Sequence, residues 1–350
     1  MRILNSMRPS PIGLVVTSAA MAAAQARRTR SGWQLSAAGT LPRSQPSGEQ
    51  LTQEEADRLQ RFLTRRGFVG RRVVASVPQR CLHMAVLDSP SRDSGAPVDD
   101  IAAAELARMH GYPPEDAETL CQDLPPSPRS KGASQLFAMS CAHEDAEKLM
   151  DSIAQAGLDV VALDSRPTAL RRACVMAGSW SHAAVLEMEP AGATMLFLHH
   201  GTIVYVRFLP QAGLDPLKTR LADRLGLTPQ ASDCLLCGAG SLQAEAETNH
   251  HADVSATIRA HLDHTIDEWR VPAAYVAQTY PDFTTEQLWL VGAGAGIRGA
   301  EQHLQEQSGF SVQVLRPASL LDCAEAVADC ADDPRLTAAV ALACYEEEDA

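Results

Sequence analysis

The order of hydrophobic segments repeats once along this chain, and that repeat restricts the possible fold more than any other feature. The pattern predicts a strand, a hairpin, a helix, a second strand and a second helix, and then the same order again. The second copy is the clearer one, with strands at 183–188, 194–199, 202–209 and 287–291 and helices at 216–225 and 297–307. We interpret the repeat as a diverged duplication, which predicts two α/β lobes around a cleft.

The first copy begins near the N-terminus, where two interpretations of the apolar stretch 12–24 are open. It is either a first β-strand at 12–17 followed by a turn, or the core of a secretory signal with Ala24-Gln25-Ala26 as its cleavage site. After a further strand at 33–39, Thr52 and Glu55 form a capping box for a helix. A strand at 73–77 then completes the first copy.

A small unit separates the two copies. Its predicted elements are a helix at 99–109, a strand at 136–140 and a helix at 144–156, with a proline-rich loop between the first two. A long helix at 254–278 lies in the second half, and Pro272 is expected to kink or interrupt it. The predicted division of the chain is 10–78, 79–157 (inserted unit), 158–180 (return to the first lobe), 181–345 and an acidic tail at 346–350.

Composition excludes several functions. The formal net charge of −13 disfavours nucleic acid as a partner, because phosphate binding requires concentrated Lys and Arg. No stretch approaches the roughly 20 apolar residues of a membrane span, so direct membrane insertion is not expected. The nine cysteines are odd in number and scattered, which favours a reducing cytoplasm over a disulfide framework.

Three segments lie where a nucleotide-binding protein of this order carries its motifs. Residues 13–19 read Gly-Leu-Val-Val-Thr-Ser-Ala, residues 186–189 read Leu-Glu-Met-Glu, and residues 290–299 are rich in glycine. In order and spacing these segments resemble the actin-like ATPase superfamily, and within it the type IV pilus assembly family PilM and its relative FtsA. The resemblance implies an α/β, actin-like (ribonuclease H-like) duplicated fold, with a small inserted α+β subdomain in the first lobe.

The resemblance also implies an altered nucleotide site. The residues at its positions are Thr17, Ser18, Glu187, Gly292, Gly294, Ala295 and Gly296. In the family the first strand carries an acidic residue and a later Lys, where this chain has Val15 and Ala22. Mg²⁺ requires hard oxygen ligands, so Val15 cannot hold it, and Glu189 adds negative charge beside the phosphates. ATP therefore stays a candidate ligand, Mg²⁺ is disfavoured, and we assign no catalytic residue and no metal ligand. The glycine segment 292–296 either packs against a nucleotide base or forms only a tight strand-to-helix turn.

The function that the resemblance implies is a cytoplasmic scaffold of type IV pilus biogenesis. Such a protein docks the N-terminal tail of an inner-membrane partner, PilN, with the groove expected beside residues 79–157, and self-association is a further possibility. The alternatives are a working actin-like ATPase that uses Glu187, or a secretion or competence scaffold such as the cytoplasmic part of GspL. A zinc site at Cys234, Cys237, His250 and His251 is disfavoured because the two histidines are adjacent. His199 and His200 are expected to be solvated at a hairpin tip.

Overall fold

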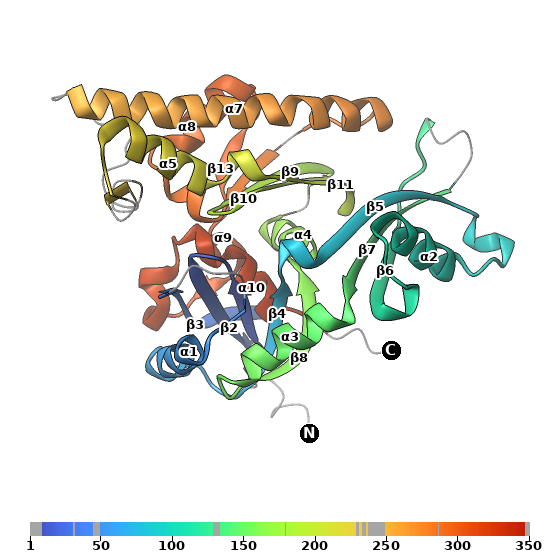
Figure 1. The fold of residues 1–350 in the computed structure, drawn as a ribbon, viewed down its shortest axis with the longest axis horizontal. Helices are drawn as coiled ribbons and strands as arrows, with labels where there is room; N and C mark the ends of the chain where they lie inside the picture. The colour runs from blue at the N-terminus through green and yellow to red at the C-terminus, as the bar shows by residue number, and fades with distance from the viewer. Residues whose placement is uncertain are drawn as a thin grey trace.

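The computed structural model describes residues 9–30, 32–44, 50–128, 134–178, 180–228, 231–232, 236, 249–285 and 287–346. Two lobes lie one above the other in Figure 1, and a smaller unit projects from the side of the first lobe. Each lobe has a mixed β-sheet, and the smaller unit has a sheet of its own.

The two large sheets have the same topology. In the first, five strands lie in the order β3 (Gly32–Pro42), β2 (Ala20–Thr29), β1 (Ile12–Val16), β4 (Arg72–Val77) and β8 (Asp159–Ser165), with the short β14 (Asp322–Cys323) beside β3. In the second, the order is β11 (Thr202–Leu209), β10 (Gly192–His199), β9 (His182–Glu189), β12 (Gln287–Val291) and β13 (Val312–Val314). Three antiparallel strands are followed by two parallel ones in both sheets. The duplication predicted from the hydrophobic pattern is confirmed.

Strand β1 shows why these residues form a central strand. All five are buried, and alternate side chains enter two different cores. Leu14 packs on one face with side chains of α1 (Gln53–Arg65) and α3 (His143–Ala154), whereas Val15 packs on the other face with α4 (Arg166–Ala177) and α10 (Thr337–Ala343). Gly13 lies directly against α10, because a Cβ there would be 2.0 Å from the carbonyl oxygen of Ala339.

One hydrophobic core joins the lobes. It contains Val74 from the first sheet, Val185 and Trp289 from the second, and Leu170 and Val340 from the helices between them. The outer face of the second sheet is covered by α5 (Leu214–Leu225), α7 (Asn249–Thr279) and α8 (Ala300–Ser308), and α7 runs across the top of the molecule in Figure 1. Short segments complete this part of the chain, namely α9 (Pro317–Leu320) and the 3₁₀ turns η8 (Ala293–Gly296) and η10 (Pro334–Leu336).

The inserted unit lies between β4 and β8. Its sheet has the order β5 (Leu82–Ser89), β7 (Ser134–Ala142), β6 (Ala117–Asp123), and α2 (Val98–His110) covers one face through Val98, Ala102 and Leu106. The expected range of 79–157 for this unit also contains α3. In the structure Leu149 and Ile153 of α3 lie in the core of the first lobe, so this helix packs with the first sheet.

Two local expectations are corrected. Pro272 does not interrupt the long helix, because α7 continues through it. The segment after β1, expected as a turn leading to 33–39, contains a ten-residue strand, β2, which pairs with β1 and β3. Its alanines have low strand propensity, but they allow α10 to approach the sheet closely. Among the described residues, none of the helices combines the length and hydrophobicity needed to cross a membrane.

Candidate nucleotide cleft between the lobes

A cavity of about 460 Å³ lies between the two lobes, at the carboxyl end of β1 and β9. The first lobe contributes Val15, Thr17 and Ala22, and the second lobe contributes the side chains of Glu187 and Glu189. Parallel α/β sheets bind ligands at this end of their strands. The expectation of two lobes around a cleft is therefore met, and the cavity is the candidate nucleotide site.

The seven residues predicted for the site do not all reach the cavity. Four of them line it, namely Thr17, Glu187, Gly292 and Gly296. The remaining three, Ser18, Gly294 and Ala295, lie outside its lining. The structure therefore brings four of the seven predicted residues together at one cavity, and their role in nucleotide binding stays a prediction.

The turn between β1 and β2 is closed on itself. The backbone N–H of Thr17 donates to the carbonyl of Ala20 at 2.9 Å, and the N–H of Ala20 donates to the Thr17 hydroxyl at 3.1 Å. A phosphate-binding loop presents such N–H groups to the ligand. Here two of them are already used within the turn.

Arg43, which the sequence analysis did not single out, holds this turn in place. Its guanidinium donates to the Thr17 carbonyl at 3.1 Å and makes two hydrogen bonds to Glu55 of α1, at 2.9 and 2.8 Å. Both side chains of the pair are fully buried. The hydrogen bonds from Arg43, aided by the Thr52 N–H, lower the pKa of Glu55 to about 2 although burial opposes the shift. A buried pair of this kind fixes the loop rigidly.

Glu187 is held by a cation from the other lobe. Arg166 is the first residue of α4, and the Ser165 hydroxyl caps that helix by accepting the Thr168 N–H at 3.1 Å. This start directs Arg166 toward β9, where its Nε lies 3.5 Å from Glu187 Oε2 and the two side chains are 8% and 3% exposed. Burial raises the pKa of Glu187, and the charge of Arg166 opposes that rise. A guanidinium therefore lies beside a carboxylate that lines the cavity.

Glu189 has an unusual protonation equilibrium. Burial raises its pKa to about 7, and the nearby Glu187 carboxylate adds to the rise, whereas Arg166, the Ala293 N–H and Arg335 oppose it. The cavity consequently gains negative charge as the pH rises through neutrality. That change disfavours a phosphate group at pH 8 more than at pH 6.

Close packing explains why glycine occupies two positions of the segment after β12. Gly292 has φ +80°, and a Cβ there would lie 2.7 Å from both the Met188 carbonyl oxygen and Glu189 Oε1. A Cβ on Gly294 would lie 2.5 Å from Met188 Cβ. Gly296 has no atom within 4 Å of its ideal Cβ position and lines the cavity. The turn interpretation thus accounts for Gly292 and Gly294, and Gly296 is the glycine available to a ligand.

Two basic residues of the second half also line the cavity. Lys218 of α5 lies 3.4 Å from Asp215, and Arg335 of η10 makes a bidentate contact with Asp333. The sequence analysis did not find either residue, since no short motif surrounds them. The lining has three carboxylates, those of Glu187, Glu189 and Asp333, against these two cations, so it lacks the positive charge of a strongly basic phosphate pocket.

The chain has an actin-like fold, as three solved structures show. A structure titled "PilM-PilN type IV pilus biogenesis complex" matches with a TM-score of 0.76 and 16% identity, over 95% of this chain and 97% of that one. The ethanolamine utilization protein EutJ from Carboxydothermus hydrogenoformans matches with a TM-score of 0.57 and 13% identity, over 97% and 90% of the two chains. MreB5 of Spiroplasma citri bound to ADP matches with a TM-score of 0.51 and 10% identity, over 95% and 94%.

These likenesses confirm the fold expected from the sequence motifs, including the similarity to PilM. No protein-family model matches the chain, and no curated protein matches it in sequence. The disfavoured zinc interpretation rests on Cys234 and Cys237, which lie outside the described residues.

Proposed function

We propose that the protein is a PilM-like scaffold of type IV pilus biogenesis, held at the cytoplasmic side of the inner membrane by a PilN-like partner. The observation that carries this proposal is the similarity to the PilM–PilN complex over 95% of this chain and 97% of that one. A fold by itself does not fix a function, so the proposal depends on the cleft and on the partner surface as well.

The cleft supports a scaffold over an enzyme. The position of the first acidic ligand is Val15, and Glu187 is paired with Arg166. The β1–β2 turn uses the Thr17 and Ala20 N–H groups internally. We therefore propose that ATP binds weakly, if at all, and that the protein does not hydrolyse it.

The inserted unit offers a surface for the partner. Its sheet has one face under α2, whereas the other face carries Met84, Val86, Leu120, Phe137 and Met139. Phe137 is buried against the core between the lobes, but Val86 is 40% exposed and Leu120 is 67% exposed. Exposed apolar side chains that continue a buried apolar face are typical of a docking site. We assign this face, beside the first lobe, to the tail of the PilN-like partner.

The register of the strands aligns these side chains. Leu120 of β6 and Met84 of β5 both lie opposite Met139 of β7, and Val86 lies opposite Phe137. They form two adjacent apolar rows across the sheet, since residues opposite each other in paired strands share a face. An extended tail with apolar side chains would fit against such rows.

The test is binding of a peptide with the sequence of the cytoplasmic N-terminal tail of a PilN protein. We expect saturable binding to the wild type and at least a tenfold loss with Leu120→Asp. The matched control is Val271→Asp on α7, because Val271 is 70% exposed and lies on the second lobe. The proposed surface would be refuted if the folded wild type does not bind the tail. It would equally be refuted if the Leu120→Asp variant binds the tail as tightly as the wild type does.

Two measurements with Mg-ATP distinguish a scaffold from an ATPase. In a calorimetric titration we expect either no binding heat or weak binding, and in a phosphate assay we expect no detectable release. Turnover of ATP at a rate that depends on Glu187 would replace the scaffold proposal with an actin-like ATPase.

A further inference from the structure

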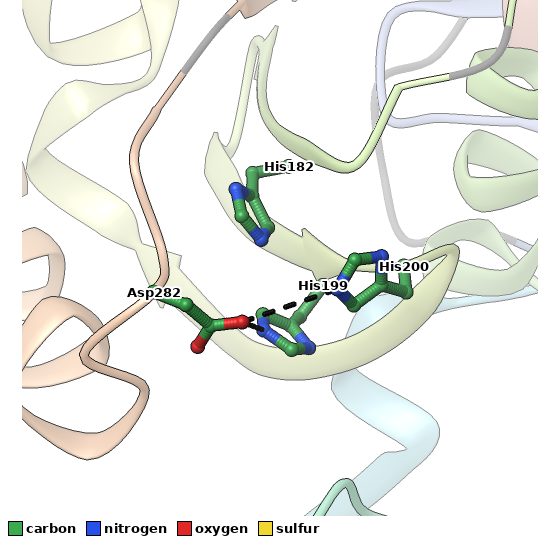
Figure 2. A group of neighbouring side chains, drawn as sticks. All are labelled: His182, His199, His200 and Asp282. Carbon is green, nitrogen blue, oxygen red and sulfur yellow. Dashed lines mark hydrogen bonds and ion pairs between the residues drawn. The ribbon is translucent and has the colours of Figure 1, made fainter.

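Three histidines and one aspartate meet at the end of the second sheet remote from the cleft. His182 is the first residue of β9, His199 is the last residue of β10, His200 lies in the following turn, and Asp282 lies just beyond α7 (Figure 2). Glu187 marks the cleft end of β9, five residues further along the same strand. The cluster is therefore separate from the candidate nucleotide site.

The polar atoms of the cluster converge. Each of the four residues offers one ligand atom, and these atoms all lie within 4.8 Å of one another. His199 Nε2 is 3.1 Å and His200 Nε2 is 4.0 Å from the same oxygen, Asp282 Oδ2. Figure 2 shows a ring nitrogen of His182 turned toward the other three side chains. The other ring nitrogen, Nδ1, accepts the Thr284 N–H at 3.4 Å, which orients the ring.

Two of the three imidazoles, those of His182 and His199, are buried among aromatic rings. His182 and His199 are each only 6% exposed. His199 stacks on Tyr280 with ring centroids 5.0 Å apart, and His182 lies 5.0 Å from the ring of Phe283. The expectation that His199 is solvated is therefore wrong; it applies only to His200, whose side chain is 61% exposed. A metal ion at this point would bind nitrogens of several of these rings together.

The conformation of the turn adds a second observation. His200 has φ +50° and Gly201 has φ +76°, as in a two-residue hairpin of type I′. His200 is the only residue other than glycine with positive φ in the described part of the chain. Asn or Asp is the usual choice at such a position. A histidine here places its imidazole beside those of residues 182 and 199.

We propose that His182, His199, His200 and Asp282 form a structural Zn²⁺ site. Three imidazole nitrogens and one carboxylate oxygen supply the four ligands of a tetrahedral site, with no position left open for a substrate. Tetrahedral ligands on zinc lie about 3.3 Å apart, so the four atoms must move inward by an ångström or so. Asp282 and His200 are at the surface, where such a movement meets little packing resistance.

The site would connect two parts of the fold that are distant in sequence. The β10–β11 turn would be bound to the segment after α7, next to a contact with the inserted unit. That contact is the hydrogen bond from the buried Ser127 hydroxyl to the Thr279 carbonyl, at 2.7 Å. Bound zinc would therefore stabilise the second lobe at the place where the inserted unit's loop reaches it.

The experiment measures zinc directly on the full chain. After dialysis against a chelator and then against a chelator-free buffer, Zn²⁺ alone is titrated into the protein with a chromophoric competitor, and the thermal midpoint is recorded with and without the ion. We expect one zinc per chain and an increase of several degrees in the midpoint, because a ligand that binds only the folded state stabilises it.

Variants locate the ion. Asp282→Asn and His200→Asn change exposed residues, and Asn tolerates the backbone of the turn, so both variants are expected to fold; each should weaken zinc binding at least tenfold. The matched control is Asp263→Asn, which changes another Asp–His pair, with Asp263 Oδ1 2.7 Å from His303 Nε2; among the described residues this pair belongs to no group of three or more potential metal ligands. The proposal would be overturned if both cluster variants bind zinc with unchanged affinity. It would also be overturned if the Cys234→Ser/Cys237→Ser variant loses zinc binding, because the ion would then be held by the cysteines. Absence of binding to the wild type would leave a hydrogen-bonded His–Asp cluster and equally end the proposal.

Discussion

Arg166 and Glu187 join the two lobes by an ion pair beneath the cleft, with Nε and Oε2 3.5 Å apart and both side chains almost fully buried. Arg166 comes from the first helix after the inserted unit, and Glu187 from the first strand of the second lobe. The pair thus places a protein cation beside a carboxylate that lines the cleft, and it links a helix of the first lobe to a strand of the second.

Removing both partners of this pair should cost less stability than the sum of the two single removals. Glu187→Leu removes the carboxylate that lies 3.5 Å from Nε of the buried Arg166, so we expect a loss of about 3–5 kcal/mol in the free energy of unfolding. The double variant Arg166→Leu/Glu187→Leu should lose at least about 1 kcal/mol less than the sum of the single variants. Urea unfolding measures all four proteins, and strict additivity would mean that the two groups do not interact.

Glu189 should make stability depend on pH around neutrality. Its pKa is about 7 in the folded protein and near 4.5 when unfolded, so the folded state favours the protonated form. This contribution is complete below about pH 4.5 and is lost as the pH rises to about 7. Glu189→Gln cannot ionise, so it does not lose this stability at high pH. We expect the melting temperature of the variant to be higher than that of the wild type at pH 8 and almost the same at pH 5.

The control for this prediction is Glu144→Gln. Glu144 is exposed on α3, and Lys148 lowers its pKa, so this substitution should not raise the melting temperature at pH 8. Equal effects of Glu189→Gln at both pH values would show that the carboxyl group is not protonated near neutrality.

Two neighbouring glycines should respond differently to alanine. Gly292 has φ +80° and meets the Met188 carbonyl oxygen at 2.7 Å from its ideal Cβ position, so Gly292→Ala combines strain with a clash against backbone. We expect a cost of at least about 1–3 kcal/mol. Gly296 is exposed and has open space, so Gly296→Ala should stay within about 0.5 kcal/mol. Thermal unfolding compares them, and any effect of Gly296→Ala on ATP binding would place the ligand at this glycine.

The Arg43–Glu55 pair should contribute stability that acid removes. The pKa of Glu55 is about 2 in the folded state against 4.5 when unfolded, so its contribution is complete above about pH 4.5 and declines toward pH 2. Glu55→Gln leaves Arg43 buried without its carboxylate, and we expect a loss of about 3–5 kcal/mol at pH 7 that shrinks at pH 3. Glu54→Gln on the exposed side of the same helix turn is the matched control, with a change near zero. A Glu55 variant that loses the same stability at both pH values would contradict the pairing.

The sequence predicted the fold because the signals it uses are local and repeated. Buried strands such as β1 and β9 are runs of apolar residues, the helix α1 begins at a capping box, and the same order occurs twice. The prediction failed at β2, whose alanines prefer helix when considered alone. That strand exists because the close packing of α10 on the sheet requires small side chains, which is a tertiary constraint.

The sequence by itself determined the duplicated α/β architecture and the position of the cleft, since both follow from hydrophobic period and element order. Only the tertiary structure decided which charged side chains lie at the cleft and which histidines and carboxylates cluster elsewhere. Arg166 reaches Glu187, Arg43 reaches Thr17 and Glu55, and His182 meets His199, His200 and Asp282, across separations of up to about a hundred residues. Charge pairing and metal ligation depend on distances in space, and one chain contains too many acids, bases and histidines for spacing alone to select the partners.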